Sequence, residues 1–490
     1  VNISGTPTVN ILGPITLGAS SNAAGPVASS LIINGGTFDI RGNIAKGTGA
    51  GAGSVTSTLT LDNATLNLNG FVIGAGARPI NSINLRSGTI RNVGEINGGN
   101  GFAKTAGVVS GNNTLILEGI NSFSGNFTIA AGTVQVGTGS TTGTLGTTSV
   151  INNAALVINR SNAYAVANVI SGTGTLAVSG TGTITLSGNN SYAGATTISA
   201  GLVSLAHANA LGNAGTGTSV SSGASLELQG GITVGAEALA IAGTGNAANG
   251  ALRNYFGANT FGGTVTLGGA TTIQSDAGTL TLNNATAIVA DVNDVTFTGA
   301  GNTTISGAIT GTTTGLTKTG NGKLTLGGNS TFQGAVNVNA GTVSVNGANG
   351  LGDAVGGTVV ASGASLELQG NVNVTSEPLD LTGTGFGGAG ALRNLSGSNT
   401  FGGPITLSGD TSVQSDAGTL TIAGNVSAGV RTLTITGSNN TTLTGVMSGG
   451  LSAALTKNGS GTLTLTGNNS FGGATTINAG SVAIGGVNVL

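Results

Sequence analysis

Residues 316–343 read LTKTGNGKLTLGGNSTFQGAVNVNAGTV, and this stretch contains the pattern that decides the fold. Leu324 and Leu326 alternate with threonine, which places the leucines on one face of a strand and the hydroxyls on the other. An Ala-Gly pair is a turn signal, and a second alternating segment that contains Val343 follows it. The stretch therefore predicts two short β-strands, with Phe332 between them and a glycine turn before the second.

The aromatic residue of this stretch belongs to a motif, Asn/Ser-Ser/Thr-Phe/Tyr-x-Gly, that recurs six times. By subtraction of their residue numbers, successive aromatics are 69, 69, 71, 69 and 70 positions apart. Such even spacing is typical of one structural unit that is stacked repeatedly, and a globular domain has no reason to produce it. The six structural repeat aromatics are Phe123, Tyr192, Phe261, Phe332, Phe401 and Phe471.

A longer period is superimposed on this unit. The segment Ser-Gly-Ala-Ser-Leu-Glu-Leu-Gln-Gly begins at Ser222 and again at Ser362, a shift of 362 − 222 = 140 positions. We therefore expect an approximately 70-residue repeat unit nested in a 140-residue block. Residues 1–106 have a similar kind of sequence but do not keep the strict repeat spacing. We therefore interpret them as divergent coils, and residues 107–490 as the regular part of one continuous solenoid.

Composition excludes several classes of protein. The 490 residues include 93 glycines, 6% charged and 3% aromatic residues, and no Cys or Trp. The chain is 38% hydrophobic with a mean hydropathy of +0.31, so it can bury an aliphatic core, unlike a disordered chain. A net charge of −2 gives no field to attract nucleic acid. No apolar run is long enough to cross a bilayer, so we expect no membrane insertion by this segment.

Short strands without helices predict an all-β fold, and the even spacing selects among the β architectures. Propeller blades repeat at a shorter interval with signatures that are absent here, and a sandwich does not repeat in this way. In a parallel β-helix each coil has about 20 to 25 residues, so one repeat unit makes about three coils. We predict a single right-handed parallel β-helix of about 20 coils, roughly 100 Å long at about 4.8 Å per strand.

Stacking also explains the neutral polar residues, because an outward residue lies above a similar one in the next coil. Like charges in such a row repel each other, whereas Thr, Ser and Asn can form hydrogen bonds along it. For the six aromatics, the main interpretation is packing at a corner of the coil. The alternative, a platform that stacks on carbohydrate, requires the rings to be exposed.

The segment from Leu316 through Phe332 to Val343, and that from Leu455 through Phe471 to Val482, resemble the passenger-associated repeats of Gram-negative autotransporters. Segments that begin at Thr181 and Asn113 are looser matches. The resemblance implies a β-helical stalk that is exposed at the outer cell surface and is exported with the help of a C-terminal barrel. The sequence ends at Leu490, directly after a repeat strand, without barrel sequence.

The sequence offers few residues that could act in catalysis. His207 is the one histidine, and the equivalent positions in other units hold Gly347 and Gly486, so it is expected in a solvated loop. One histidine and no cysteine give a single candidate base and no common zinc site. Asp291 and Asp294 are the nearest pair of carboxylates and are expected to cap a turn. We therefore predict no catalytic residues, no metal and no cofactor.

The segment Gly383–Gly388 formally matches the dinucleotide-binding pattern G-x-G-x-x-G. Its counterpart in the preceding block, which begins at Gly243, lacks the third glycine, and no helix is predicted to follow. We therefore reject nucleotide binding.

Charged residues that occur in both 140-residue blocks are the exceptions to the neutral pattern. Isolated charges in such a chain need partners, so we predict structural ion pairs between coils. A carboxylate face that cleaves polysaccharide is the alternative, but such a site normally occurs once along a solenoid. The duplicated residues are Glu227 with Glu367, Arg253 with Arg393, Asp276 with Asp416, and Glu237 with Glu377.

Repetition without a site predicts a non-enzymatic extracellular or cell-surface β-solenoid with a structural or adhesive role, whose partner is a host or neighbouring cell surface. A different class of function is a subunit that assembles with itself into a filament or surface layer. That alternative depends on Val1–Ser4 and Val482–Leu490, which resemble strands and carry no polar cap.

Overall fold

The structure is a computed structural model, and it describes residues 2–18, 25–48, 54–74, 77–107 and 113–486. The chain is an all-β parallel solenoid with 2% helix and about 19 turns, so the predicted fold class is confirmed. The helical residues of the described ranges lie in three short 3-10 turns, η1 (Asn97–Gly99), η2 (Asn246–Ala248) and η3 (Phe386–Gly388). The chain forms two compact units, Val1–Glu227 and Leu228–Leu490, and each is considered by itself.

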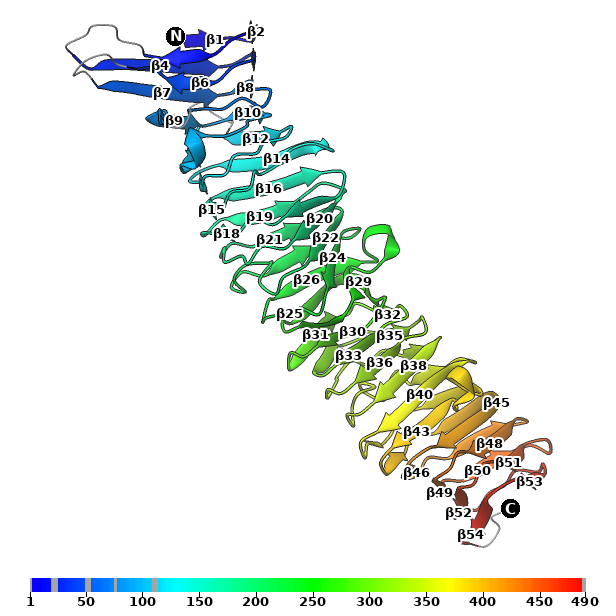
Figure 1. The fold of residues 1–490 in the computed structure, drawn as a ribbon. Coiled ribbons are helices and arrows are strands. Elements are labelled where there is room, and N and C mark those ends of the chain that lie inside the picture. The colour runs from blue at the N-terminus through cyan, green and yellow to red at the C-terminus, as the bar shows by residue number, and fades with distance from the viewer. Residues whose placement is uncertain (1, 19–24, 49–53, 75–76, 108–112, 487–490) are drawn as a thin grey trace. The chain divides into compact units, whose positions relative to one another are not determined.

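The first unit contains a sheet of eight parallel strands, in which each strand comes from a different coil (Figure 1). Its register is continuous: Ile33 pairs with Leu61, which pairs with Leu85. In order across the sheet, the strands are β1 (Asn2–Ser4), β4 (Val27–Asn34), β7 (Val55–Asp62), β9 (Ser82–Leu85), β11 (Phe102–Lys104), β13 (Phe127–Ile129), β15 (Val150–Asn152) and β18 (Ile170–Ser171).

The second unit repeats this arrangement. A ladder of parallel strands carries Glu367 and Arg393, and it consists of β28 (Ala258–Phe261), β30 (Thr279–Leu282), β33 (Asn302–Ile305), β36 (Lys323–Leu326), β38 (Gly341–Val345), β40 (Ala364–Gln369), β43 (Leu392–Ser396) and β45 (Ile405–Ser415). A six-stranded sheet lies beside it in the coil, with β41 (Asn373–Val374), β44 (Asn399–Phe401), β46 (Thr419–Ile422), β49 (Asn440–Leu443), β52 (Thr462–Leu465) and β54 (Ser481–Ile484).

The coils have unequal lengths, although the register of their strands is kept. Thr281, Thr304, Thr325 and Ser344 occupy one outward row on β30, β33, β36 and β38. By subtraction of their residue numbers, successive members of this row are 23, 21 and 19 positions apart. At such spacings about three coils fit between successive repeat aromatics, as the sequence predicted.

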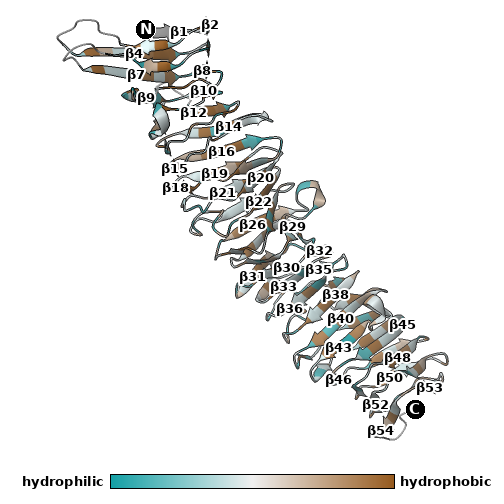
Figure 2. Ribbon diagram, in the orientation of Figure 1, coloured by the Kyte–Doolittle hydropathy of each residue, from teal (hydrophilic) through white to brown (hydrophobic). Residues whose placement is uncertain are grey.

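Most strands bury every second side chain, as the alternation in the sequence requires, whereas every residue of β22 (Leu202–Leu205) and β38 is buried. Figure 2 shows hydrophobic residues recurring at intervals along the strands. Burial of an aliphatic side chain contributes about 1.5–3 kcal/mol relative to exposure, so a row of this kind holds each coil against the next. One inward row, whose members are at most 1% exposed, consists of Leu282, Ile305, Leu326, Val345 and Leu368.

The pattern changes in the last described coil. Ile477 is 52% exposed and Ile484 is 53% exposed, and Val482 is half-buried. Among the described residues, β54 pairs only with β52, so its side chains are covered from one side. Phe471 lies in the same coil and is half-buried for the same reason.

Candidate functional site

Five of the six repeat aromatics are fully buried: Phe123, Tyr192, Phe261, Phe332 and Phe401. Their rings fill the interior of the coil and present no face to solvent, so they do not form a platform for carbohydrate. This placement agrees with the packing interpretation of the repeat motif.

Three of these rings are covered by a glycine of the next coil, in a relationship that the sequence analysis missed. At Gly352, φ is +83°, and a Cβ built there would lie 2.9 Å from the ring of Phe332. The following amide, that of Asp353, donates a hydrogen bond of 2.8 Å to the carbonyl of Phe332. The recurring Leu-Gly pairs at residues 145–146, 211–212 and 351–352 are the signal that could have revealed this contact.

Glu367 and Arg393, two of the duplicated charges of the second unit, continue the outward row beyond Ser344 and form a chain of ion pairs with Lys323 and Asp416. Lys323 Nζ lies 2.7 Å from Glu367 Oε2, and Arg393 Nη1 lies 2.7 Å from Glu367 Oε1. Arg393 Nε also donates a hydrogen bond of 2.6 Å to Asp416. Cation and anion alternate from Lys323 to Asp416, with the coil of Ser344 between Lys323 and Glu367, and the side chain of Glu367 is 2% exposed. The cluster is therefore internally neutralised, as a structural role requires.

The block that precedes it makes a related but different set of contacts. Arg253 Nε donates a hydrogen bond of 2.8 Å to Asp276 Oδ2. Glu227 accepts a hydrogen bond of 2.8 Å from Ser204 Oγ within the first unit. Thr183 stands at the position that corresponds to Lys323, so the added lysine is a feature of the later block alone.

Burial opposes the charge of Arg393, but the hydrogen bonds and charges of Asp416 and Glu367 outweigh it and raise the pKa of the guanidinium. The group therefore remains charged at any physiological pH.

Three buried lysines form a second set of polar contacts that the sequence analysis did not single out. Lys318 Nζ donates to the carbonyl of Thr319 at 2.6 Å and to that of Gly320 at 2.7 Å, and Lys457 makes the equivalent bonds one block later. Burial lowers the pKa of Lys318 to about 8 and also lowers that of Lys457. These lysines tie a turn to the core, and their recurrence in successive blocks was the available signal.

Lys104 occupies a comparable site in the first unit. It is fully buried, and its Nζ donates to Asn113 Oδ1 at 2.7 Å and to the carbonyl of Ala131 at 3.1 Å. Burial lowers its pKa to about 8, and the charge of Asp62 opposes this change only in part.

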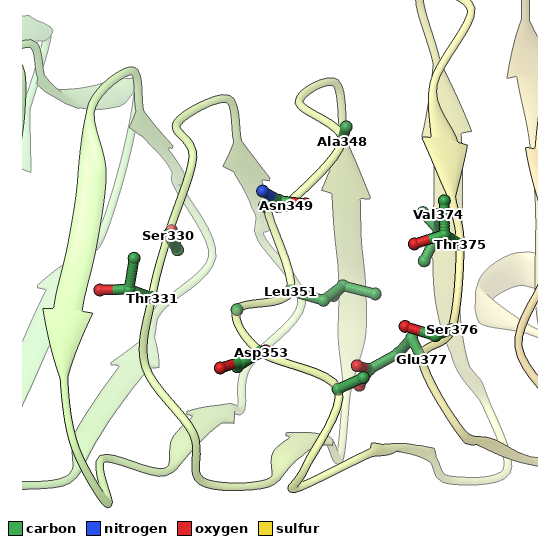
Figure 3. A pocket seen from close by; sticks show the side chains of 12 residues that line it. Ser330, Thr331, Ala348, Asn349, Leu351, Asp353, Val374, Thr375, Ser376 and Glu377 are labelled. Carbon is green, nitrogen blue, oxygen red and sulfur yellow. The ribbon is translucent and has the colours of Figure 1, made fainter.

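A pocket of about 270 Å³ lies between three successive segments of the second unit (Figure 3). Ser330 and Thr331 form one wall, the segment Ala348–Ala354 forms the middle, and Val374–Glu377 form the opposite wall. Hydrogen bonds between coils position these segments. The amide of Ser330 donates a hydrogen bond of 3.1 Å to the carbonyl of Asn349, and the amide of Asp353 donates one of 2.8 Å to the carbonyl of Phe332.

Glu377 is the most perturbed group of this pocket. Its side chain is buried, with 4% exposure, and its Oε1 accepts a hydrogen bond of 2.7 Å from Thr358 Oγ1. Burial raises the pKa of Glu377 to about 7; the hydrogen bond from Thr358 lowers it and the nearby charge of Asp353 raises it. Perturbed carboxyl groups in a concave site are typical of binding or catalytic positions. We therefore take this pocket as the candidate functional site.

The remaining residues that the sequence singled out have structural surroundings. His207 Nδ1 accepts a hydrogen bond of 3.0 Å from the amide of Asn209, within a turn. Asp294 Oδ1 accepts one of 2.8 Å from the amide of Gly315 in the next coil. The amide of Phe386, within the glycine-rich segment Gly383–Gly388, donates 2.8 Å to Ser365 Oγ, so this segment lies against β40.

Two exposed aromatic residues were also missed. Tyr255 is 46% and Phe256 is 45% exposed, and their ring centroids are 5.5 Å apart. The guanidinium of Arg253 lies 4.9 Å from the centroid of the Tyr255 ring. The corresponding residues of the next block are Leu395 and Ser396, so the repeat architecture does not require this aromatic pair.

Within the described ranges, no three or more His, Asp or Glu side chains gather in a way that could hold a metal ion. Within the same ranges, no helix has the length and apolarity that are needed to span a bilayer.

Comparison with known proteins identifies the repeats. Four segments match the family model described as passenger-associated-transport-repeat, at residues 108–136, 176–205, 316–345 and 455–484. The predicted resemblance is thus confirmed, and the chain carries passenger-associated transport repeats. Lys318, Lys457 and the inward Leu326 lie within the matched segments.

A stretch of 148 residues is 39% identical to the Adhesin BmaC autotransporter of Brucella suis biovar 1 (strain 1330). The match covers 27% of this chain and 4% of that relative, so the chain corresponds to a small part of its length. No solved structure matches the chain.

Proposed function

We propose that this chain is a non-enzymatic segment of an extracellular, cell-surface β-solenoid that acts as a stalk with an adhesive role. The observation that carries the proposal is the presence of four passenger-associated transport repeats within a parallel solenoid. The similarity to an autotransporter adhesin supports the adhesive part of it.

The surface chemistry of the coils also supports this role. Thr281, Thr304 and Thr325 present half-buried hydroxyl groups along the outward row. Beyond the buried Ser344, the charges of Glu367 and Arg393 continue the row and neutralise each other. A surface of this kind presents hydrogen-bonding groups without a strong field, so it is suited to short-range contact with a neighbouring surface rather than to electrostatic capture.

Two measurements test the proposal. Antibodies against the purified chain should label intact cells of the bacterium that produces it, and beads coated with the chain should bind to host or neighbouring cells. Beads that carry the heat-unfolded chain provide the control. Labelling that appears only after the cells are lysed would contradict the surface location, and equal binding by native and unfolded chain would contradict the adhesive role.

Electron microscopy and an activity assay separate this proposal from the alternatives. A stalk segment should give single particles at all concentrations, whereas a filament subunit should give continuous fibres. Release of reducing or unsaturated ends from a panel of polysaccharides would contradict the non-enzymatic assignment. We expect single particles and no release.

A further inference from the structure

The pocket between Ser330 and Glu377 carries chemistry that a spacer does not need. We propose that it is a binding site for one amino sugar residue, a hexosamine whose protonated amine pairs with the carboxylates of Glu377 and Asp353. This inference goes beyond the proposed adhesive role, because it depends on the pocket alone and not on where the chain is located.

The described residues that line the pocket include acidic side chains and no basic ones. Glu377 has a buried side chain, and only Oε1 has a hydrogen-bond partner among the described residues, namely Thr358. In Figure 3 the carboxyl group of Glu377 points into the space between the segments. Asp353 lines the same pocket, and none of the described residues that line it is Lys, Arg or His. A site with two carboxylates and no cation in its lining repels anions and attracts an ammonium group.

The remainder of the lining combines hydroxyl groups with apolar side chains. Hydroxyl groups come from Ser330, Thr331, Thr375 and Ser376, and they can both donate and accept hydrogen bonds. Leu351 and Val374 add an apolar surface that is at most 4% exposed. A sugar ring presents several hydroxyls together with an apolar C–H face, which matches such a lining. A simple alkyl amine would make fewer hydrogen bonds to these hydroxyl groups than a sugar ring would.

The volume of the pocket limits the size of its ligand. A volume of about 270 Å³ is slightly below the ~300–1,000 Å³ of typical small-molecule pockets, so one sugar ring fits and an oligosaccharide does not. The remainder of a glycan would extend into solvent from the exposed side, where Thr375 and Ser376 lie. An N-acetylated sugar has no positive charge to offset the buried carboxylate of Glu377 and should therefore bind more weakly.

The preceding 140-residue block shows which residue can replace one of the two carboxylates of the pocket. Asp353 corresponds to Asn213 in the preceding block, whereas Glu377 corresponds to Glu237. Asp353→Asn thus introduces a residue that the repeat already tolerates at this position. Glu377→Gln keeps an acceptor for Thr358 and removes the charge, so it should leave the fold intact.

The test is calorimetric titration of the full chain with glucosamine, together with N-acetylglucosamine, glucose and lysine amide as separate arms. We expect a Kd for glucosamine on the order of 1 mM at pH 7, as is usual for a ligand of this size. The Kd should be at least tenfold higher for Glu377→Gln and about threefold higher for Asp353→Asn. Asp380→Asn, which changes a carboxylate outside the pocket lining, should leave it unchanged.

The pH dependence gives an independent readout. Glu377 and Asp353 are the acidic residues of the lining. The amine of the ligand remains protonated in acid, so it does not contribute to a change in Kd between pH 5 and pH 7. Burial raises the pKa of Glu377 to about 7, so Glu377 is largely neutral at pH 5, and the Kd should be at least tenfold higher there than at pH 7. Glu377→Gln should abolish most of this difference.

Three outcomes would overturn the proposal. They are equal affinity for glucosamine and N-acetylglucosamine, unchanged affinity of a folded Glu377→Gln variant, and affinity for lysine amide equal to that for glucosamine. The last result would identify a general ammonium site that serves protein side chains. Circular dichroism and thermal melting of each variant establish that a loss of binding does not reflect unfolding.

Discussion

Gly212 covers the ring of Tyr192: a Cβ built at Gly212 would lie 3.0 Å from the ring and 2.5 Å from the carbonyl oxygen of Tyr192. The φ angle of Gly212 is +79°, which L-residues rarely adopt. The amide of Asn213 donates a hydrogen bond of 2.9 Å to the same carbonyl. The aromatic residue of one coil thus constrains the backbone of the next, as Phe123 and Phe332 also do through Gly146 and Gly352.

Gly212→Ala should therefore destabilise the first unit by about 2–4 kcal/mol, because it combines backbone strain with a clash against a packed ring. Thermal unfolding of the purified chain measures the change. Gly215→Ala is the matched control, since a Cβ there meets no described atom within 4 Å, and it should be nearly neutral. Equal effects of the two substitutions would show that the contact with Tyr192 does not matter.

Two equivalent serines should respond differently to removal of the hydroxyl. Ser344 Oγ is buried and has no hydrogen-bond partner among the described residues, because Glu367 is occupied by Lys323 and Arg393. Ser344→Ala should therefore be neutral or stabilising by up to about 1 kcal/mol, since an unpaired buried hydroxyl carries a desolvation penalty.

At the corresponding position of the preceding block, Ser204 donates to Glu227 at 2.8 Å. Ser204→Ala should cost about 1.5–3 kcal/mol, the usual range for a hydrogen bond to a charged group. Chemical denaturation of both variants measures the contrast, and a destabilisation by Ser344→Ala as large as that by Ser204→Ala would refute this account of the ion-pair chain.

Lys318→Met should destabilise the second unit by about 1–3 kcal/mol, because methionine has a similar length but cannot donate to the carbonyls of Thr319 and Gly320. Those carbonyls would be left without their buried partner. Hydrogen exchange of the amides in the adjoining turn measures the local effect. Lys46→Met, outside the matched repeats, provides the control and should change little.

Glu377 should make the stability of the second unit depend on pH. Its pKa is about 7 in the folded state and near 4.5 when unfolded, so between these values the folded chain binds the extra proton. Stability from this group is thus fully present below pH 4.5 and is lost as pH rises towards 7. The loss should reach at most about 2 kcal/mol, because water at the mouth of the pocket screens the charge.

Comparison of melting temperatures at pH 4.5 and pH 7.5 for the parent chain and Glu377→Gln isolates this contribution. The parent should lose more stability over the interval than the variant, since glutamine does not titrate. Parallel pH profiles for the two proteins would show that Glu377 is not a buried titrating group. Asp380→Asn should follow the parent.

The sequence predicted the architecture because its signals are local. Alternation of Leu324 and Leu326 with threonine assigns each side chain to a face, and the motif around Phe332 recurs in every unit. The pairing of Arg393 with Asp416 could also be anticipated, since both charges occur in each of the two blocks. The buried role of Lys318 was missed, because a lysine is usually placed in solvent unless its partners are known.

The candidate pocket could not be predicted from these local sequence signals. Nothing near Glu377 in the sequence indicates that it faces Ser330, 47 positions earlier (377 − 330), or that Asp353 lies between them. The exposed pair of Tyr255 and Phe256 was likewise invisible, because the sequence alone does not tell a buried aromatic residue from an exposed one.

By itself, the sequence determined a stacked all-β solenoid, because alternation within a strand and repetition between coils are properties of the chain order. Only the tertiary structure decided which side chains meet across coils. Coils of unequal length bring Thr281, Thr304, Thr325 and Ser344 into one row, so no fixed offset predicts a neighbour. Contacts such as that between Lys323 and Glu367, two coils apart, arise because hydrogen-bonded strand register, rather than distance along the chain, sets what lies side by side.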